Sequence, residues 1–351
     1  MDATCAIQNS IHVFSLVHIN MCPEFWVHIT HSNVRFYVIL IIMMFIKDCN
    51  IMKLMNQKLT KYTWLLPFIS GICWGAAGIF VRTLEHDGLD NFSIISFRML
   101  LAALITGIWI LFYNRHLFYV HQRDFWLFIG SGMIGMTALS VFYNISVTKG
   151  SLALSAVLLA MSPVFVLFLA AVFFHEPVTR HKLICVTLAL IGCVLVSGVL
   201  ESNGLSWSIT GILCGILASF FYAVYGIISK KVTQKGYHFL TITFYGTLFS
   251  GMTMLPFSNI HSLSSMIVSG QRTTFFILII HALVSSVLPY ALYSLSMRYM
   301  EAGKASILAS SEPAAAMLFG AVLYAETPGI LSICGLCFTI GAVILLNYER
   351  N

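Results

Sequence analysis

The chain has 351 residues, of which only 19 are Lys or Arg and 13 are Asp or Glu, so 9% are charged. An ordinary soluble domain has about 25% charged residues. Hydrophobic residues make up 59%, the mean hydropathy is +0.89 and the formal net charge is +6. A soluble fold of this length cannot bury so much apolar surface, which excludes a soluble enzyme, a disordered chain and a disulfide scaffold. The basic residues are too few and too dispersed for a nucleic-acid interface.

Ten apolar runs follow residue 63. A helix needs about 20 apolar residues to cross a membrane, and the runs lack the period-two alternation of barrel strands. The expected fold class is therefore all-α, a polytopic membrane protein with ten transmembrane helices. The expected spans are residues 64–81, 92–113, 125–147, 151–174, 181–200, 207–229, 239–257, 274–297, 302–324 and 329–347.

The N-terminal part has a different composition. Residues 36–46 form an apolar run of eleven residues, which is short for a span and resembles the core of a signal peptide. We interpret residues 1–51 as a leader that is not part of the fold, with Met52 or Met55 as a natural start. An eleventh helix, interfacial or short and spanning, at residues 34–47 is the alternative.

The distribution of Lys and Arg predicts the orientation. If the segment before the first span is cytoplasmic, thirteen Lys and Arg fall in inner loops and only Arg82, Lys149 and Arg272 fall in outer loops. Because cytoplasmic loops carry the excess of basic residues, both termini are expected in the cytoplasm. The chain is then an integral multi-pass protein of the plasma membrane or a bacterial inner membrane.

The sequence contains a duplication. Residues 142–178 align with residues 292–328 at a constant offset of 150 without a gap. The expected repeats are residues 52–200 and 201–351, with five spans each. Since five is odd, the second repeat enters the membrane from the opposite side, an arrangement known in secondary transporters with substrate bound between the repeats. Matching pairs include Tyr143 with Tyr293, Pro163 with Pro313, Glu176 with Glu326 and, in a weaker match, Gly88 with Gly236.

Four segments carry a resemblance to a known family. They are WGAAGIFVR (74–82), FRMLLAALI (97–105), SAVLLAMSPVFVLFLAAVFFHEPVT (155–179) and ASILASSEPAAAMLFGAVLYAETP (305–328). Together they resemble the EamA domain of the drug/metabolite transporter superfamily. The resemblance implies a carrier of two repeats, in a family that includes exporters of amino acids, metabolites and drugs.

Glu312 lies near the middle of the span 302–324, where a carboxylate is costly unless it is paired, neutral or hydrated. Pro313 follows it without an N–H to donate, and Ser310 and Ser311 precede it, so we expect a polar, partly unwound turn. In the functional interpretation, Glu312 contacts a cationic or amine group of the substrate or takes up a coupling proton. In the structural interpretation, it is a neutral, hydrogen-bonded part of a helix break.

Arg98 lies about two turns from the outer end of the span 92–113. It either extends to the outer headgroups, or faces the bundle and pairs with a carboxylate or binds a substrate carboxylate. A coupling between Arg98 and Glu312 is a further hypothesis. His281 is interpreted as a packing residue, with a proton relay as the alternative. Glu176 lies at a span end, where a capping or interfacial role suffices.

Aromatic and hydroxyl side chains recur at spacings of three and four, so each set shares a helical face. Lipid does not favour a face of hydroxyls, and we expect these faces to point inward. They either line a translocation cavity and bind substrate, or form interhelical hydrogen bonds that hold the bundle together. The sets are Ser219, Tyr222, Tyr225 and Ser229; Ser286, Tyr290, Tyr293 and Ser294; Ser140, Tyr143 and Asn144; and Trp74 alone.

The sequence contains only weak indications of catalysis or metal binding. Cys334 and Cys337 form a CxxC pair in an apolar run without partner ligands, and we interpret them as buried thiols. No GxSxG, HExxH or Walker pattern occurs in a suitable context. We therefore expect no catalytic residue, no metal and no cofactor.

The sequence predicts a secondary transporter, not an enzyme, that moves a small organic metabolite by alternating access. An amino acid or similar amphiphile is the expected cargo and export the expected direction. The expected partners are the substrate, the lipid bilayer and a coupling proton or ion, with the chain as a monomer or homodimer. An intramembrane enzyme or a flippase for lipid-linked substrates, using the same central cavity, is the alternative. The candidate substrate-binding residues are Trp74, Arg98, Tyr143, Asn144, Tyr222, Tyr225, Tyr290, Tyr293, Ser310, Ser311 and Glu312.

Overall fold

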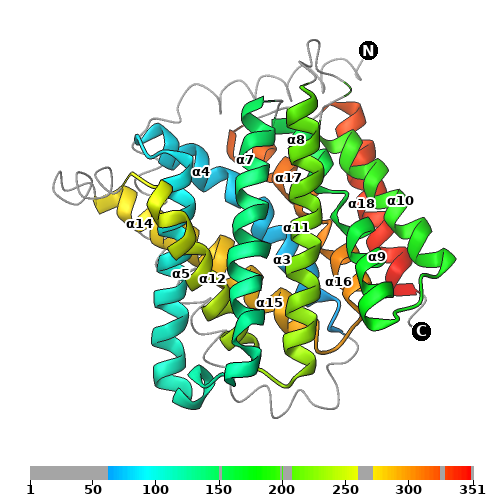
Figure 1. The fold of residues 1–351 in the computed structure, drawn as a ribbon. Helices are drawn as coiled ribbons and strands as arrows, with labels where there is room; N and C mark the ends of the chain where they lie inside the picture. Colours follow the sequence, from blue (N-terminus) through cyan, green and yellow to red (C-terminus); the bar gives the residue numbers. More distant parts are fainter. Residues whose placement is uncertain are drawn as a thin grey trace, which may run out of the picture. The chain divides into compact units, whose positions relative to one another are not determined.

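A computed structural model describes residues 62–149, 152–197, 200, 208–259, 272–324 and 329–348. All regular elements within these ranges are helical (Figure 1), which confirms the expected all-α class for this part of the chain. The leader predicted at residues 1–51 and the predicted repeat partner Glu326 lie outside the described residues.

Eight helical stretches of the described chain are long and apolar enough to cross a membrane. They coincide with eight of the ten predicted spans. The stretches are Leu65–His86, Asn91–Tyr113, Gln122–Lys149, Leu154–Phe174, Ile209–Gln234, Thr273–Ser296, Ala302–Leu323 and Ile330–Asn347.

The other two predicted spans are also helical but shorter. α10 (Arg180–Val196) has 17 residues and α12 (Phe239–Met254) has 16. At 1.5 Å per residue they measure about 24–26 Å, less than the hydrocarbon thickness of about 30 Å. A turn of 3-10 helix, η5 (Leu255–Phe257), continues α12.

Two of the spans are each broken into two helices at equivalent places. Residues 160–161 and 310–311 are non-helical turns, and Pro163 and Pro313 follow them in the first turn of the next helix. Proline is tolerated there because the first N–H groups of a helix have no intrahelical partner. All four helix boundaries recur 150 residues later. The helices are α8 (Leu152–Leu159), α9 (Ser162–Phe174), α16 (Ala302–Ala309) and α17 (Glu312–Tyr324).

Two further spans contain π-helical turns, which often occur at functional sites. Residues 283–287 of the second turn lie 150 positions after residues 133–137 of the first. Pro289 follows the second turn. In chain order the elements are α6 (Phe125–Ile129), η4 (Gly130–Ala138) and α7 (Leu139–Lys149), and then α14 (Arg272–Ala282), η6 (Leu283–Val287) and α15 (Leu288–Ser296).

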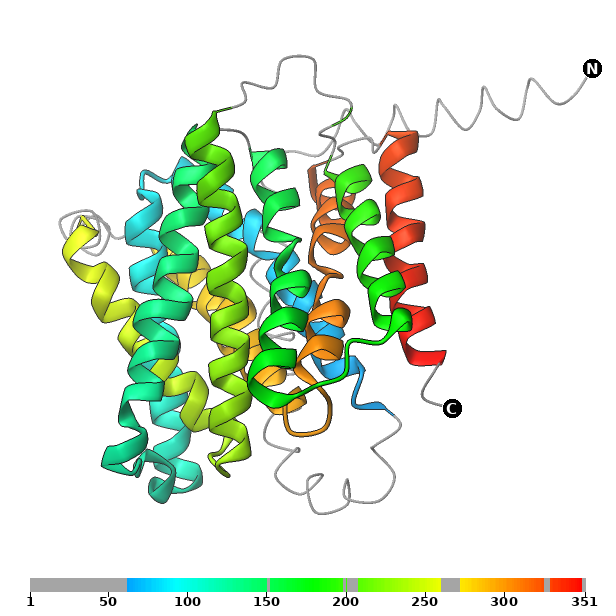
Figure 2. The ribbon, with the colours of Figure 1, turned by 45° about the vertical axis from the view of Figure 1, so that its right-hand side comes forward.

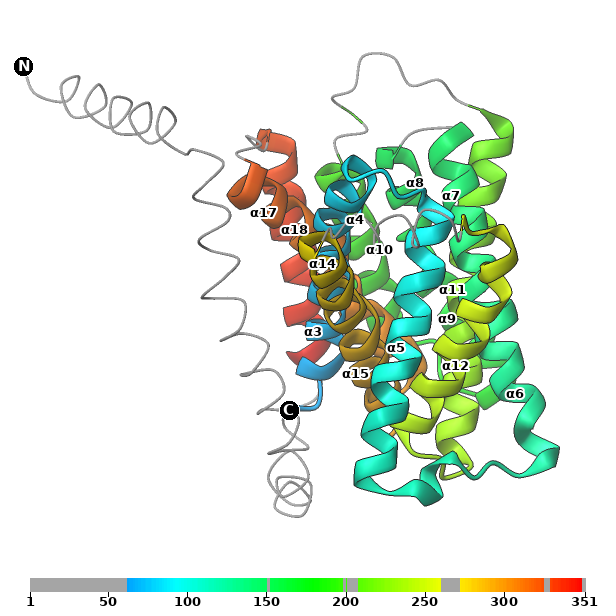
Figure 3. The same cartoon turned by 90° about the vertical axis from the view of Figure 1, so that its left-hand side faces the viewer.

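The remaining helices complete the bundle around α11, which packs against α7, α8, α9 and η4. α10 and α18 lie side by side (Figure 2), and α5 packs against α12 and α14 (Figure 3). α3 contacts α15, α16 and α17. The bounds are α3 (Leu65–Gly75), α4 (Ala77–His86), α5 (Asn91–Tyr113), η2 (Arg115–Phe118), η3 (Gln122–Asp124), α11 (Ile209–Gln234) and α18 (Ile330–Tyr348).

The predicted pair Gly88 and Gly236 also has matching geometry. Gly88 follows α4 with a φ of 94°, and Gly236 follows α11 with a φ of 86°. This left-handed conformation ends many helices and is accessible to glycine without steric cost. The same chain reversal therefore follows both helices.

Large apolar side chains are exposed on the outer helix faces. Phe112, Val322 and Ile330 are 89%, 78% and 81% exposed, as expected of surfaces that face lipid. Cys334 and Cys337 are exposed free thiols on α18. The interpretation of these two cysteines as buried is therefore wrong, because both lie on the outer face of α18.

Candidate functional site

Five aromatic side chains from three helices form one group, which we call the aromatic cluster. Trp74 comes from α3, Tyr222 and Tyr225 from α11, and Tyr290 and Tyr293 from α15. The tyrosines are at most 6% exposed, which confirms that their faces point inward. Ring centroids lie 5.4 Å apart for Trp74–Tyr290 and Tyr225–Tyr290, 5.6 Å for Trp74–Tyr293, 5.8 Å for Trp74–Tyr222, 6.1 Å for Tyr222–Tyr293 and 6.2 Å for Tyr225–Tyr293. These are favourable distances for aromatic pairs.

Hydroxyl groups accompany the aromatic rings. Tyr225 Oη and Ser294 Oγ lie 3.4 Å apart and join α11 to α15. Tyr293 Oη and Ser229 Oγ are buried and make no hydrogen bond of normal geometry, although they lie near the hydroxyls of Tyr222 and Tyr225. A buried hydroxyl that lacks a partner costs free energy, so these two groups are available to a ligand that offers a polar atom.

The predicted helix break lies beside this cluster. Glu312 is the first residue of α17 and is half-buried. Ser310 Oγ donates to Ser306 O at 3.2 Å, and Ser311 Oγ donates to Phe68 O at 3.0 Å. The predicted interruption before Pro313 is confirmed, and the Ser311 hydroxyl ties it to the beginning of α3.

α3 crosses this break with its backbone in close contact. A Cβ on Gly75 would lie 2.6 Å from the Glu312 carbonyl oxygen, and a Cβ on Gly71 would lie 2.5 Å from the Ala309 carbonyl oxygen. Small residues at such crossings let two helices approach closely. The glycines thus place Trp74 of α3 and Glu312 of α17 in the same region.

α3 connects Glu312 with the aromatic cluster, because it carries Trp74 and packs against both α15 and α17. Tyr143 and Asn144 belong to α7, which packs against α11. Asn144 is 8% exposed and its Nδ2 has no hydrogen-bond partner.

Arg98 of α5 faces the interior of the bundle. Its Nη1 lies 3.3 Å from Nε2 of His281, a residue with no exposed surface whose ring stacks on Phe80 at 5.2 Å. Arg98 therefore points into the bundle, while the carboxylate partner that the inward alternative also predicted stays a prediction. None of the ion pairs in the described residues joins Arg98 to Glu312, so their coupling stays a prediction.

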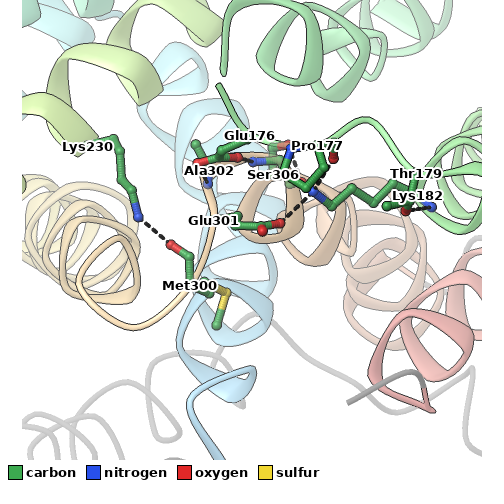
Figure 4. Close-up of polar contacts among 10 residues, drawn as sticks. Glu176, Pro177, Thr179, Lys182, Lys230, Met300, Glu301, Ala302 and Ser306 are labelled. Carbon is green, nitrogen blue, oxygen red and sulfur yellow. Dashed lines mark hydrogen bonds and ion pairs between the residues drawn. The ribbon is translucent and has the colours of Figure 1, made fainter. Parts of the chain in front are cut away.

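A second polar network joins the end of α9 to the start of α16 (Figure 4). Glu176 Oε1 accepts a hydrogen bond from Ala302 N at 2.9 Å, and Glu176 Oε2 accepts one from Gly303 N at 3.3 Å. The first N–H groups of a helix lack intrahelical partners and favour negative charge. Glu176 therefore has the capping role that its position at a span end predicted.

Two lysines hold the same loop, residues 297–301. Lys182 Nζ lies 2.5 Å from Glu301 Oε2, and the Lys182 side chain is 2% exposed. Lys230 Nζ donates to the carbonyls of Met297 at 2.8 Å and Met300 at 2.6 Å. Charged groups from α10, from α11 and from the segment between α9 and α10 thus fix the loop between α15 and α16, as Figure 4 shows for the Met300 bond and the ion pair.

A cavity of about 240 Å³ opens beside this loop. None of the eleven predicted substrate-binding residues lines it. Charged and aromatic groups face it together, at the end of the bundle where α3 begins and α18 ends. Its lining consists of Trp64, Tyr299, Met300, Glu301, Lys304, Leu308, Leu346 and Asn347.

The structure gathers most of the predicted site residues around α11 and α17, while Arg98 lies with His281 between α5 and α14. The sequence analysis did not identify the Arg98–His281 contact or the Lys182–Glu301 ion pair. Both join residues more than 100 positions apart, and no spacing rule connects such residues. An intramembrane histidine and a buried lysine were the available signals, because each needs a partner in the bundle.

A family comparison decides the classification. The EamA-like transporter family matches the chain twice, over residues 60–198 and 209–348. The chain belongs to the EamA-like transporter family. With eight apolar helices in its described part, this EamA-like transporter is an integral multi-pass membrane protein.

Similar proteins of this family are named as transporters. An uncharacterized transporter of Archaeoglobus fulgidus is 23% identical over 82% of this chain and 99% of its own length. The uncharacterized transporter YxxF of Bacillus subtilis is 24% identical over 81% and 88%. A probable terminal-alkyne amino-acid exporter of Streptantibioticus cattleyicolor is 23% identical over 83% and 95%.

A solved structure titled "Crystal structure of protein" has a similar fold. The TM-score is 0.65 at 12% sequence identity, and the match covers 81% of this chain and 95% of the solved one. At that identity the likeness shows the fold alone.

Proposed function

We propose that this EamA-like transporter is a secondary carrier that exports a small organic metabolite, an amino acid or similar amphiphile, by alternating access. The observation that carries the proposal is the aromatic cluster, buried between α3, α11 and α15, beside a helix break that ends in Glu312. Aromatic faces and a carboxylate together attract an ammonium group. The amino-acid exporter among the similar proteins supports the same class of cargo.

We also propose ten membrane spans in two inverted repeats, residues 52–200 and 201–351. The two family matches, the recurring boundaries of α8–α9 and α16–α17, and the recurring π-helical turns support this division. Trp64, just before α3, lines a cavity together with residues 299–301 and 304. Lys230, near the end of α11, donates to the carbonyls of residues 297 and 300. The start of α3 and the end of α11 thus lie near the same loop, which supports opposite directions for the first helices of the two proposed repeats.

In this carrier, the aromatic cluster and Glu312 bind the cargo, and Glu312 exchanges the amine for a coupling proton. Ser310 and Ser311 form the flexible break, and Tyr143 and Asn144 complete the polar wall from α7. Substrate binding at a broken helix near the membrane midplane is the arrangement used by transporters whose unwound backbone lines a cavity. The carrier lies in the plasma membrane or a bacterial inner membrane, with both termini in the cytoplasm. The network of Glu176 and Lys182 then lies at the cytoplasmic end of the bundle and helps to close that end of the transport path.

Counterflow in proteoliposomes tests this function. Protein reconstituted with an internal unlabelled amino acid should accumulate the labelled form, and Glu312→Gln should reduce this exchange at least about 10-fold, as loss of a charged hydrogen-bond partner does. Glu85→Gln is the matched control, because Glu85 is exposed and its carboxylate accepts a hydrogen bond from Asn91 that glutamine can also accept. Absence of exchange across amino acids, amines and related metabolites, or unchanged exchange in Glu312→Gln, contradicts the proposal. Product formation without flux would instead indicate an enzyme.

A further inference from the structure

Arg98 is a half-buried cation that has no acidic partner in the described structure. Its Nη1 contacts His281 Nε2 at 3.3 Å, and its Nε is buried without a hydrogen-bond partner. An arginine inside a membrane protein normally pairs with an anion, because an unpaired buried charge is strongly unfavourable. The site therefore lacks the group that would balance it.

The contact with Arg98 fixes the tautomer of His281. A guanidinium has only N–H donors, so Nε2 of His281 must accept and the ring proton lies on Nδ1. Nδ1 is buried and has no partner. Stacking on Phe80 at 5.2 Å and 18° holds the ring in this orientation. The pair thus presents two unused N–H donors, Arg98 Nε and His281 Nδ1.

Two further unused groups follow on the same span. Ser285 and Ser286 lie four and five residues after His281, in the π-helical turn η6, and both hydroxyls are buried without partners. Residues at this spacing continue one helical face. η6 packs against α5, the helix of Arg98. Among these unpaired groups, hydrogen-bond donors therefore outnumber acceptors, and a cluster of donors is complementary to an anion.

The position of Tyr290 relates this set to the proposed site. Tyr290 belongs to α15, which continues η6, and η6 packs against α5, the helix of Arg98. α15 also packs against α3, which contacts α17, the helix of Glu312. The aromatic cluster is thus connected to a cation on α5 and to a carboxylate on α17. A ligand that carries both charges satisfies both sides, whereas an amine satisfies only one.

We infer that Arg98 and His281 form a carboxylate subsite, so that the cargo is an amino carboxylate rather than an amine. This inference rests on the proposed transport function and names the substrate class of the same site. Arg98 binds the carboxylate, and His281 is a positioning residue that orients the guanidinium through Nε2. Charge-assisted bonds from a guanidinium to a carboxylate are among the stronger polar contacts.

Matched substrate pairs test the subsite in proteoliposomes made with the full chain. Phenylalanine and phenethylamine, and likewise leucine and isoamylamine, differ only in the carboxylate. Arg98→Gln should raise the KM for the amino acids by about 10- to 100-fold and leave the KM for any transported amine within about twofold. Arg98→Lys should restore part of the amino-acid affinity, because it keeps the charge without the planar fork.

His281 is tested by two variants. His281→Gln keeps an acceptor for Arg98 and should retain most of the preference for amino acids, whereas His281→Leu should lose it. An equal loss of affinity for amino acid and amine in Arg98→Gln would show a structural role and overturn the subsite. Equal affinity of wild-type protein for both members of each pair would do the same.

An inorganic anion such as chloride is the other ligand that the donors of Arg98 and His281 fit. Transport is therefore compared in chloride and in gluconate buffer. Loss of a chloride requirement in Arg98→Gln, with unchanged selectivity between the matched pairs, would assign the site to chloride and overturn the carboxylate subsite. A wild-type protein that exchanges neither member of any pair refutes the proposed function itself. A wild-type protein that prefers amino acids, with the preference lost in Arg98→Gln, supports both.

Discussion

The Glu176 carboxylate accepts a hydrogen bond from the backbone N–H of Ala302 at 2.9 Å, so the end of α9 caps the start of α16. These residues lie 126 positions apart and belong to different proposed repeats. The Glu176 side chain therefore links the two proposed halves at the end of the bundle where α16 begins, beside the Lys182–Glu301 ion pair.

Removal of this cap should weaken the link. Glu176→Ala leaves two N–H groups of α16 unpaired and should lower the unfolding free energy by about 1 kcal/mol, as for other helix caps. Thermal unfolding in detergent measures the effect. Glu85→Ala, at an exposed site, serves as the control and should change stability by less than about 0.5 kcal/mol. Equal effects of the two changes would contradict a capping role.

The close contact between α3 and α17 predicts that alanine has different effects on stability at two glycines of the first span. Gly75→Ala places a methyl group 2.6 Å from the Glu312 carbonyl oxygen, and overpacking of this kind costs about 1–3 kcal/mol. A Cβ on Gly78 meets nothing within 4 Å, so Gly78→Ala should be neutral or stabilise by up to about 1 kcal/mol. Thermal unfolding separates the two variants, and a stable Gly75→Ala protein would show that the crossing is looser than described.

Tyr293→Phe separates folding from binding. Tyr293 Oη is buried without a hydrogen-bond partner, so its removal should leave the unfolding free energy within about 0.5 kcal/mol of wild type. Any larger loss of substrate affinity then reports a contact with the cargo. Tyr225→Phe removes the hydroxyl that faces Ser294 and should cost about 1 kcal/mol. If Tyr293→Phe alters neither stability nor affinity, the Tyr293 hydroxyl has no part in the site.

The environment of His238 leads us to expect that the stability of the protein depends on pH. It caps the start of α12, where Nδ1 accepts from Leu240 N at 3.3 Å. Burial, and then the charge of Arg298, lowers the pKa of His238 from 6.5 to about 4. The unfolded chain therefore binds a proton before the folded one does, and stability should fall as the pH drops from 6.5 toward 4.

His238→Asn tests this assignment. Asparagine caps helices and does not titrate in this range. Thermal unfolding between pH 7.5 and pH 4.5 should show a smaller decline in the variant than in wild type. Parallel curves for the two proteins would assign the acid sensitivity to other groups.

Much of the fold follows from local rules. Long apolar runs predicted the helices, and the prolines at 163 and 313 predicted where two of them break, because proline cannot occupy a helix interior without loss of a hydrogen bond. The hydroxyl and aromatic faces of α11 and α15 were correctly expected to point inward, since lipid offers no partner for a hydroxyl.

The site itself depends on tertiary packing. The contact between Arg98 and His281 requires α5 and α14 to be neighbours, and no periodicity in either helix encodes that. Cys334 and Cys337 show the converse limit: in a membrane protein an apolar run does not reveal which face of a helix is buried, because lipid and protein interior are equally apolar.

The recurring breaks of α8–α9 and α16–α17 differ in three side chains, since Ala160, Met161 and Ser162 stand 150 positions before Ser310, Ser311 and Glu312. Of the two equivalent helix breaks, only the one between α16 and α17 therefore carries a titratable side chain. In the proposed carrier, only the break of the second repeat can therefore take up and release a proton, while the equivalent break of the first repeat keeps the same charge throughout the cycle.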